Sequence, residues 1–169
     1  MAEESKENKS YLNYGVITGV VLIVFFVIYY VFGLMTNKAL ALLPTVVYIV
    51  LVIVAQVNYA KSLNGNISFG NLFAAGFKAA AAATAIYLVF LILFLLFVPS
   101  FKETMLEAQR VAMVQKGIPA DVIDKGMAMA QKTFTVITIG GALVINLILG
   151  VIAALIGAAV AKKNPQPKS

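Results

Sequence analysis

The sequence lacks three residue types that often carry chemistry: it contains no cysteine, no histidine and no tryptophan. Without cysteine and histidine there can be no disulfide, thiol nucleophile, imidazole base or ordinary zinc site. Charge is also scarce, at 12% of 169 residues, whereas an average soluble domain has about 25%. With 62% hydrophobic residues, this composition is typical of a membrane protein.

Four apolar segments are each long enough to cross a bilayer core about 30 Å thick, which takes roughly 20 helical residues. They lie at about 14–35, 40–59, 70–98 (with residues 79–98 in the apolar core) and 134–161. We therefore predict an all-α integral membrane protein whose four transmembrane helices form one domain over residues 14–161.

Polar segments flank this domain. Residues 1–13 precede it, and a basic tail follows at 162–169. The glutamates of the leading segment and the length of the first apolar run favour an uncleaved anchor over a signal peptide.

Proline and serine mark the expected helix ends. Pro44 fits the first turn of the second span, Ser68 fits the N-cap of the third, and Pro99 closes the third. Residues 99–133 form a charged loop that breaks at Gly117-Ile118-Pro119 and contains four of the six methionines. The apolar spacing on both sides predicts two amphipathic helices, which lie on the membrane, fold against each other or extend the neighbouring spans.

Small residues recur at helical spacing in the fourth and first spans and predict faces for close helix contact. They are Gly150, Ala153, Ala154, Gly157, Ala158 and Ala161, with Gly15 and Gly19 in the first span. The face of the fourth span could pack within the chain, or it could bind a second copy or another membrane protein.

Apart from Lys78, which precedes the apolar core of the third span, the hydrogen-bonding side chains of the spans are uncharged, and the spans hold no Asp, Glu or Arg. Tyr48, Gln56, Tyr87 and Asn146 are expected to form interhelical hydrogen bonds, or else to line an uncharged cavity. The missing intramembrane charge argues against ion-coupled transport. Lys78, just before the apolar core of the third span, is expected to be an interfacial anchor.

These features predict a non-catalytic membrane protein that self-associates or serves as an accessory subunit of a larger membrane complex. The alternative is an uncoupled transporter or channel for a small solute or lipid. No cofactor or metal is expected. The bilayer is the expected partner, and nucleic acid is not, because the residues behind the net charge of +6 are dispersed beside apolar segments.

The order of these features resembles an uncharacterised bacterial family. It is a domain-of-unknown-function family of small four-span inner-membrane proteins, common in Bacteroidetes. The resemblance rests on the Gly-bearing first span, the Gly-Asn-Ile-Ser-Phe segment at 65–69, Pro99, and the Gly/Ala-rich fourth span followed by Lys162-Lys163. It implies an architecture and a bacterial inner-membrane location, and it transfers no activity. The two lysines next to the fourth span favour cytoplasmic termini.

Overall fold

The computed structural model describes residues 10–37 and 39–161 of the chain. Four of its helices are long and apolar enough to cross a membrane: α1 (Ser10–Val31), α2 (Leu43–Ser62), α3 (Phe69–Phe97) and α5 (Ala120–Val160). A short 3₁₀ helix, η1 (Leu34–Thr36), and helix α4 (Pro99–Gln115) complete the fold. No strand occurs within these described ranges, and the predicted all-α multi-pass membrane protein is confirmed. Most of the polar segment 1–13 and the basic tail 162–169 lie outside the described residues.

The helix ends follow the local chemistry of the sequence. Pro44 lies in the first turn of α2, where the missing backbone N–H costs little. The Ser68 hydroxyl oxygen accepts the backbone N–H of Asn71 at 3.2 Å, so Ser68 is the N-cap of α3, as predicted. Helix α1 ends before residue 35, the predicted limit, because Gly33 takes a left-handed conformation with φ of 65°.

The chain divides into two compact units, which are described separately. The first, here called the bundle unit, covers Met1–Tyr87 and Ile145–Ser169. The second, here called the hairpin unit, covers Leu88–Val144.

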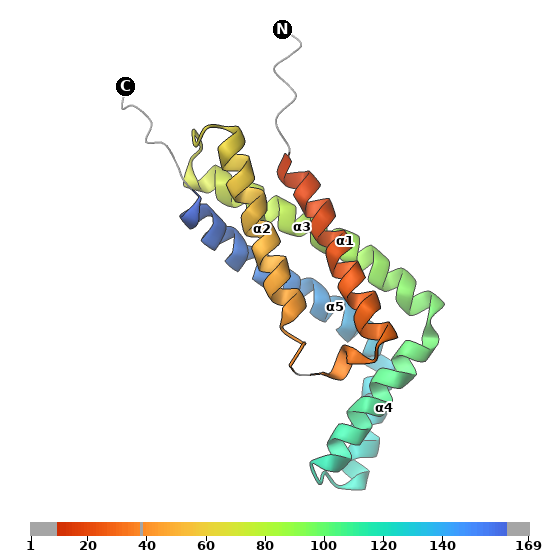
Figure 1. Ribbon diagram of the computed structural model, residues 1–169. Helices are drawn as coiled ribbons and strands as arrows, with labels where there is room; N and C mark the ends of the chain where they lie inside the picture. Colours follow the sequence, from red (N-terminus) through yellow and green to blue (C-terminus); the bar gives the residue numbers. More distant parts are fainter. Residues whose placement is uncertain (1–9, 38, 162–169) are drawn as a thin grey trace. The chain divides into compact units, whose positions relative to one another are not determined.

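The bundle unit consists of α1, α2 and the adjoining parts of α3 and α5 (Figure 1). Its central cluster joins Leu22 of α1, Tyr48 and Val52 of α2, and alanines of α3 and α5. At one end, Ala60, Leu72 and Ala158 form a further cluster. The end of α2, the start of α3 and the end of α5 therefore lie together, as expected for helices that cross a bilayer in alternating directions.

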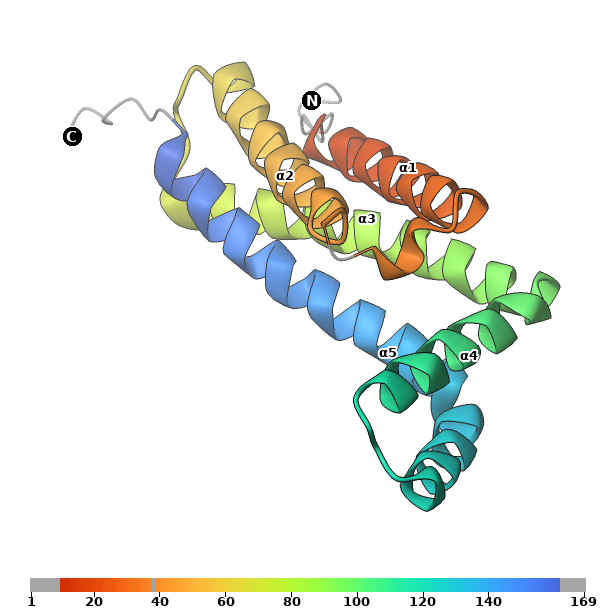
Figure 2. The same cartoon turned by 60° about the horizontal axis from the view of Figure 1, so that its bottom comes forward.

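In the hairpin unit, α4 runs antiparallel to the first turns of α5 (Figure 2). Phe101 faces Phe134 with ring centroids 6.2 Å apart, and Arg110 lies 3.4 Å from Asp124. The turn is closed at Gly117, where the Ile118 N–H donates to the Met113 carbonyl at 3.2 Å. Of the arrangements expected for residues 99–133, the two helices fold against each other, and the second continues into the fourth span.

This continuity makes α5 a single helix of 41 residues. At about 1.5 Å per residue its length is about 60 Å, roughly twice the thickness of a bilayer core. The predicted span at 134–161 is therefore the second part of a longer helix. Its charged first turns, which carry Asp121, Asp124 and Lys125, belong outside the hydrocarbon.

Single-cysteine labelling tests the crossing of α2, because the wild-type chain has no cysteine. Thr36→Cys and Ser62→Cys place thiols at exposed positions before and after this helix. We expect a membrane-impermeant maleimide to reach the two thiols from opposite sides of sealed vesicles. Labelling of both from the same side would contradict a transmembrane α2.

Candidate functional site

The side-chain amide of Gln56 lies in the middle of the bundle unit and is fully buried, with 0% exposure. Its Nε2 group donates to the Leu72 carbonyl of α3 and to the Ala154 carbonyl of α5, both at 2.9 Å. Because only the NH₂ side of the amide can donate to carbonyls, these partners determine its orientation. One side chain of α2 thus binds the backbones of two other helices.

Two glycines make room for this amide. A Cβ atom built at Gly76 of α3 or at Gly157 of α5 would collide with the Gln56 side chain. Any larger residue at either position would displace it. We call Gln56, Gly76 and Gly157 the glutamine clamp.

Tyr48 repeats the arrangement two turns earlier on α2. Its hydroxyl donates to the Asn146 carbonyl of α5 at 3.0 Å and lies 3.5 Å from the Ala80 carbonyl of α3. Gly150 allows this approach, since a Cβ there would lie 3.0 Å from the Tyr48 hydroxyl and 2.8 Å from the Ala80 Cβ. Helix α2 is therefore bound to α3 and α5 at two levels.

Glycines of α1 serve a similar purpose against α3. A Cβ at Gly15 would lie 2.7 Å from the Ala79 carbonyl oxygen, and one at Gly19 would lie 2.9 Å from the Cβ of Ile86. Both glycines of the predicted contact motif thus lie where two helix backbones approach closely.

The small-residue face of the fourth span lies inside the chain. Its six members are all buried, and three of the alanines have no exposed surface: Gly150, Ala153 (0%), Ala154 (0%), Gly157, Ala158 (0%) and Ala161. Of the two alternatives for this face, packing within the chain accounts for this burial, because residues of α2 and α3 of the same chain cover it. The association of the chain with a second copy or another protein would therefore use a surface other than the small-residue face of α5.

The four polar residues expected either to bond between helices or to line a cavity lie at two levels of the bundle unit. Gln56 and Tyr48 are eight residues apart, or about 12 Å along the helix. Tyr87 packs against the cluster that contains Tyr48, and Asn146 accepts the Tyr48 hydrogen bond through its backbone carbonyl. Gln56 and Tyr48 thus form the interhelical hydrogen bonds that were one of the two expectations.

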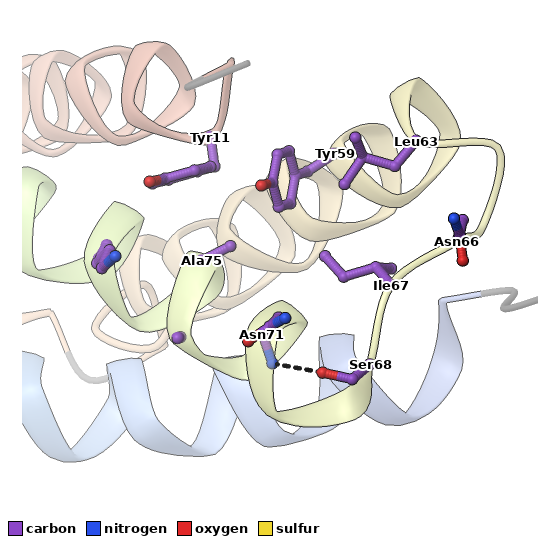
Figure 3. A pocket seen from close by; sticks show the side chains of 10 residues that line it. Tyr11, Tyr59, Leu63, Asn66, Ile67, Ser68, Asn71 and Ala75 are labelled. Carbon is purple, nitrogen blue, oxygen red and sulfur yellow. Dashed lines mark hydrogen bonds between the residues drawn. The ribbon is translucent and has the colours of Figure 1, made fainter. Parts of the chain in front are cut away.

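A pocket of about 400 Å³ lies at the end of the bundle unit where α1 begins (Figure 3). Its lining comes from the start of α1, the end of α2, the 63–68 connection and the first turns of α3: Tyr11, Tyr59, Leu63, Asn66, Ile67, Ser68, Asn71, Ala74, Ala75 and Lys78. We call it the interfacial pocket.

Of this lining, the sequence reasoning selected only Lys78 as a functional candidate. The sequence contains a signal for two further lining residues, because Asn71 and Ala75 share one face of α3 with Lys78, at i, i+4 and i+7. The pairing of that face with Tyr11 and Tyr59, whose ring centroids are 5.0 Å apart, depends on packing between helices.

Two of the four acidic side chains of the hairpin unit lie beside basic ones. Asp124 pairs with Arg110 at 3.4 Å and Asp121 lies 4.0 Å from Lys125, all with exposed side chains. No cluster of three or more metal-binding side chains occurs in the described part of the chain.

A family model described as "Protein of unknown function (DUF4199)" matches residues 13–163. No curated protein and no solved structure matches the chain. The match confirms the resemblance to an uncharacterised family, while the bacterial origin inferred from that resemblance stays a prediction.

Gly157→Leu tests the glutamine clamp. The new side chain must expel the Gln56 amide, so we expect overpacking to cost about 1–3 kcal/mol and each lost interhelical hydrogen bond a further ~0.6–2 kcal/mol. The measurement is thermal unfolding of the purified protein in detergent. Gly140→Leu on the same helix is the matched control, since a Cβ there meets no atom within 4 Å. Equal stability of the two variants would contradict the clamp.

Proposed function

The chain belongs to the DUF4199 family of proteins of unknown function, and we propose that it is a non-catalytic membrane protein that acts by association. Its partner is a second copy of itself or a larger membrane complex in which it is an accessory subunit. The observation that supports this proposal best is the exposed apolar surface of the otherwise charged hairpin unit.

The absence of catalysis is proposed from the distribution of reactive groups. Within the bundle unit, the hydroxyls of Thr18 and Thr84 donate to carbonyls one turn earlier in their own helices, at 2.7 and 2.8 Å. Gln56 and Tyr48 are engaged in the same way with neighbouring helices. The polar chemistry of the membrane region is thus used for packing.

Large apolar side chains are exposed on both helices of the hairpin unit. On α4, Val111 is 44% exposed and Val114 is 60% exposed, and the two share a face at i and i+3. On α5, Val122 and Met129 are 48% and 68% exposed and share a face at i and i+7. Because this segment is too charged to lie in hydrocarbon, such exposure is typical of a protein contact surface.

Methionine suits such a surface, because its flexible thioether adapts to irregular partners. With the small-residue face of α5 buried, this hairpin surface replaces it as the proposed site of association.

We further propose a bacterial inner-membrane location with cytoplasmic termini. Support comes from Lys162 and Lys163, which follow the fourth span directly, as the positive-inside rule favours. Their structure lies outside the described residues.

Photo-crosslinking in native membranes tests the proposed association. A benzophenone amino acid at Val114 or Met129 is expected to give adducts heavier than the monomer by the mass of a protein, because these positions face the partner. Placed at Phe101, which is only 4% exposed, it should give no intermolecular adduct.

Identification of the adducts by mass spectrometry separates a second copy from another subunit. Adducts with lipid alone at both exposed positions would contradict the proposal and would indicate that the hairpin unit lies on the bilayer surface.

A further inference from the structure

The interfacial pocket exposes more polar than apolar surface, and its polar groups include one cation. Ala74, Ala75, Ile67 and Leu63 contribute its apolar walls, and Tyr11 and Tyr59 face it from α1 and α2 (Figure 3). Asn66, Ser68 and Asn71 supply amide and hydroxyl groups. Lys78, two turns beyond Asn71 on α3, is the only charged residue of the lining within the described part of the chain. The pocket therefore suits an amphiphilic ligand.

The pocket lies at the level where the apolar spans begin. Tyr11 packs with Ala75 and Ala79 of α3, and Ala79 is the first residue of the apolar core at 79–98. Gly15 of α1 also lies against Ala79. Tyr14 accepts a hydrogen bond from Asn58 at 2.9 Å in the same region. Tyrosine and amide side chains gather where a bilayer has its headgroups. A ligand in this pocket would therefore share the depth of lipid headgroups.

The charge of the pocket favours a monoanion. A phosphodiester carries one negative charge, which one lysine can balance, whereas inorganic phosphate near neutral pH carries more charge and has no apolar part. Among the residues that the structure describes, the lining includes no carboxylate that could pair with an ammonium group of a zwitterionic lipid. Asn and Ser side chains can both donate to and accept from hydroxyl groups.

A volume of about 400 Å³ also exceeds what a bare phosphate ion would fill and lies within the usual range of small-molecule sites, about 300–1,000 Å³.

We propose that the interfacial pocket binds the headgroup of an anionic glycerophospholipid, with the Lys78 ammonium on the phosphodiester and Asn66, Ser68 and Asn71 around a hydroxylated headgroup. This site is independent of the proposed association, which uses the hairpin unit. It gives Lys78 a specific ligand in addition to its expected role as an anchor.

Native mass spectrometry of the full-length protein in detergent tests the proposal. The probes are phosphatidylglycerol and phosphatidylcholine with identical acyl chains, added in equal amounts. We expect the wild type to retain phosphatidylglycerol about tenfold better, since one charge-assisted hydrogen bond supplies a factor of this size. Lys78→Met should abolish this preference, and Lys78→Arg should keep it.

The matched control is Lys61→Met, which removes an exposed lysine at the end of α2 that does not line the pocket. This variant should keep the wild-type preference, which excludes a general effect of net charge. Equal loss in the two Met variants, or an unchanged preference in Lys78→Met, would overturn the proposal. Displacement of the lipid by excess inorganic phosphate would overturn it as well, because the site would then be one for soluble phosphate.

Discussion

The arrangement of the bundle unit depends on one buried amide. The NH₂ group of Gln56 requires hydrogen-bond acceptors, because an unsatisfied donor in a membrane interior costs several kcal/mol; the Oε1 atom of the same amide is buried without a partner among the described residues. Its NH₂ group finds two carbonyls, on α3 and α5, and both are within reach only because residues 76 and 157 have no side chain. The polar group therefore requires a close approach of three helices, and the glycines permit it. Tyr48 and Gly150 impose the same requirement two turns away.

This constraint determines where function can be sought. In many membrane proteins a face of small residues binds a partner helix. Here the small-residue face of α5 is buried by packing within the chain. Gln56 and Tyr48, the two fully buried polar side chains of α2, bind the backbones of neighbouring helices. What remains accessible lies outside the packed interior: a pocket with one lysine at an end of the bundle unit, and exposed valines and a methionine on a charged hairpin.

The sequence was sufficient for the features governed by local chemistry. Hydropathy and length predicted the four spans, and the positions of Pro44 and Ser68 followed from the requirements of helix starts. The break at Gly117-Ile118-Pro119 was predicted for a similar reason, since Pro119 is well placed to start a helix. In the structure Gly117 takes a left-handed conformation there.

The pairing between helices could not be read in this way. Nothing in the spacing of Gln56 indicates that it meets Gly76 and Gly157, which are 20 and 101 residues away, because the contact depends on the rotation of three helices about their axes. The same holds for the interfacial pocket, where Tyr11 and Lys78 approach each other only after α1 and α3 have packed. The sequence could show which helix faces carry small or polar residues, but not whether these faces point inward or outward.

The most direct test of the glutamine clamp is a set of nuclear Overhauser contacts in nanodiscs that hold one chain each. The account predicts cross-peaks from the Gln56 side-chain amide protons to the α-protons of both Gly76 and Gly157. It also predicts slower exchange of these amide protons with solvent than for the exposed Gln109, Gln115 and Gln131. Absence of the Gly157 contact in the monomeric sample would contradict the glutamine clamp. So would a Gly157 contact that appears only between differently labelled chains, in nanodiscs that hold more than one chain. The small-residue face of α5 would then bind another chain.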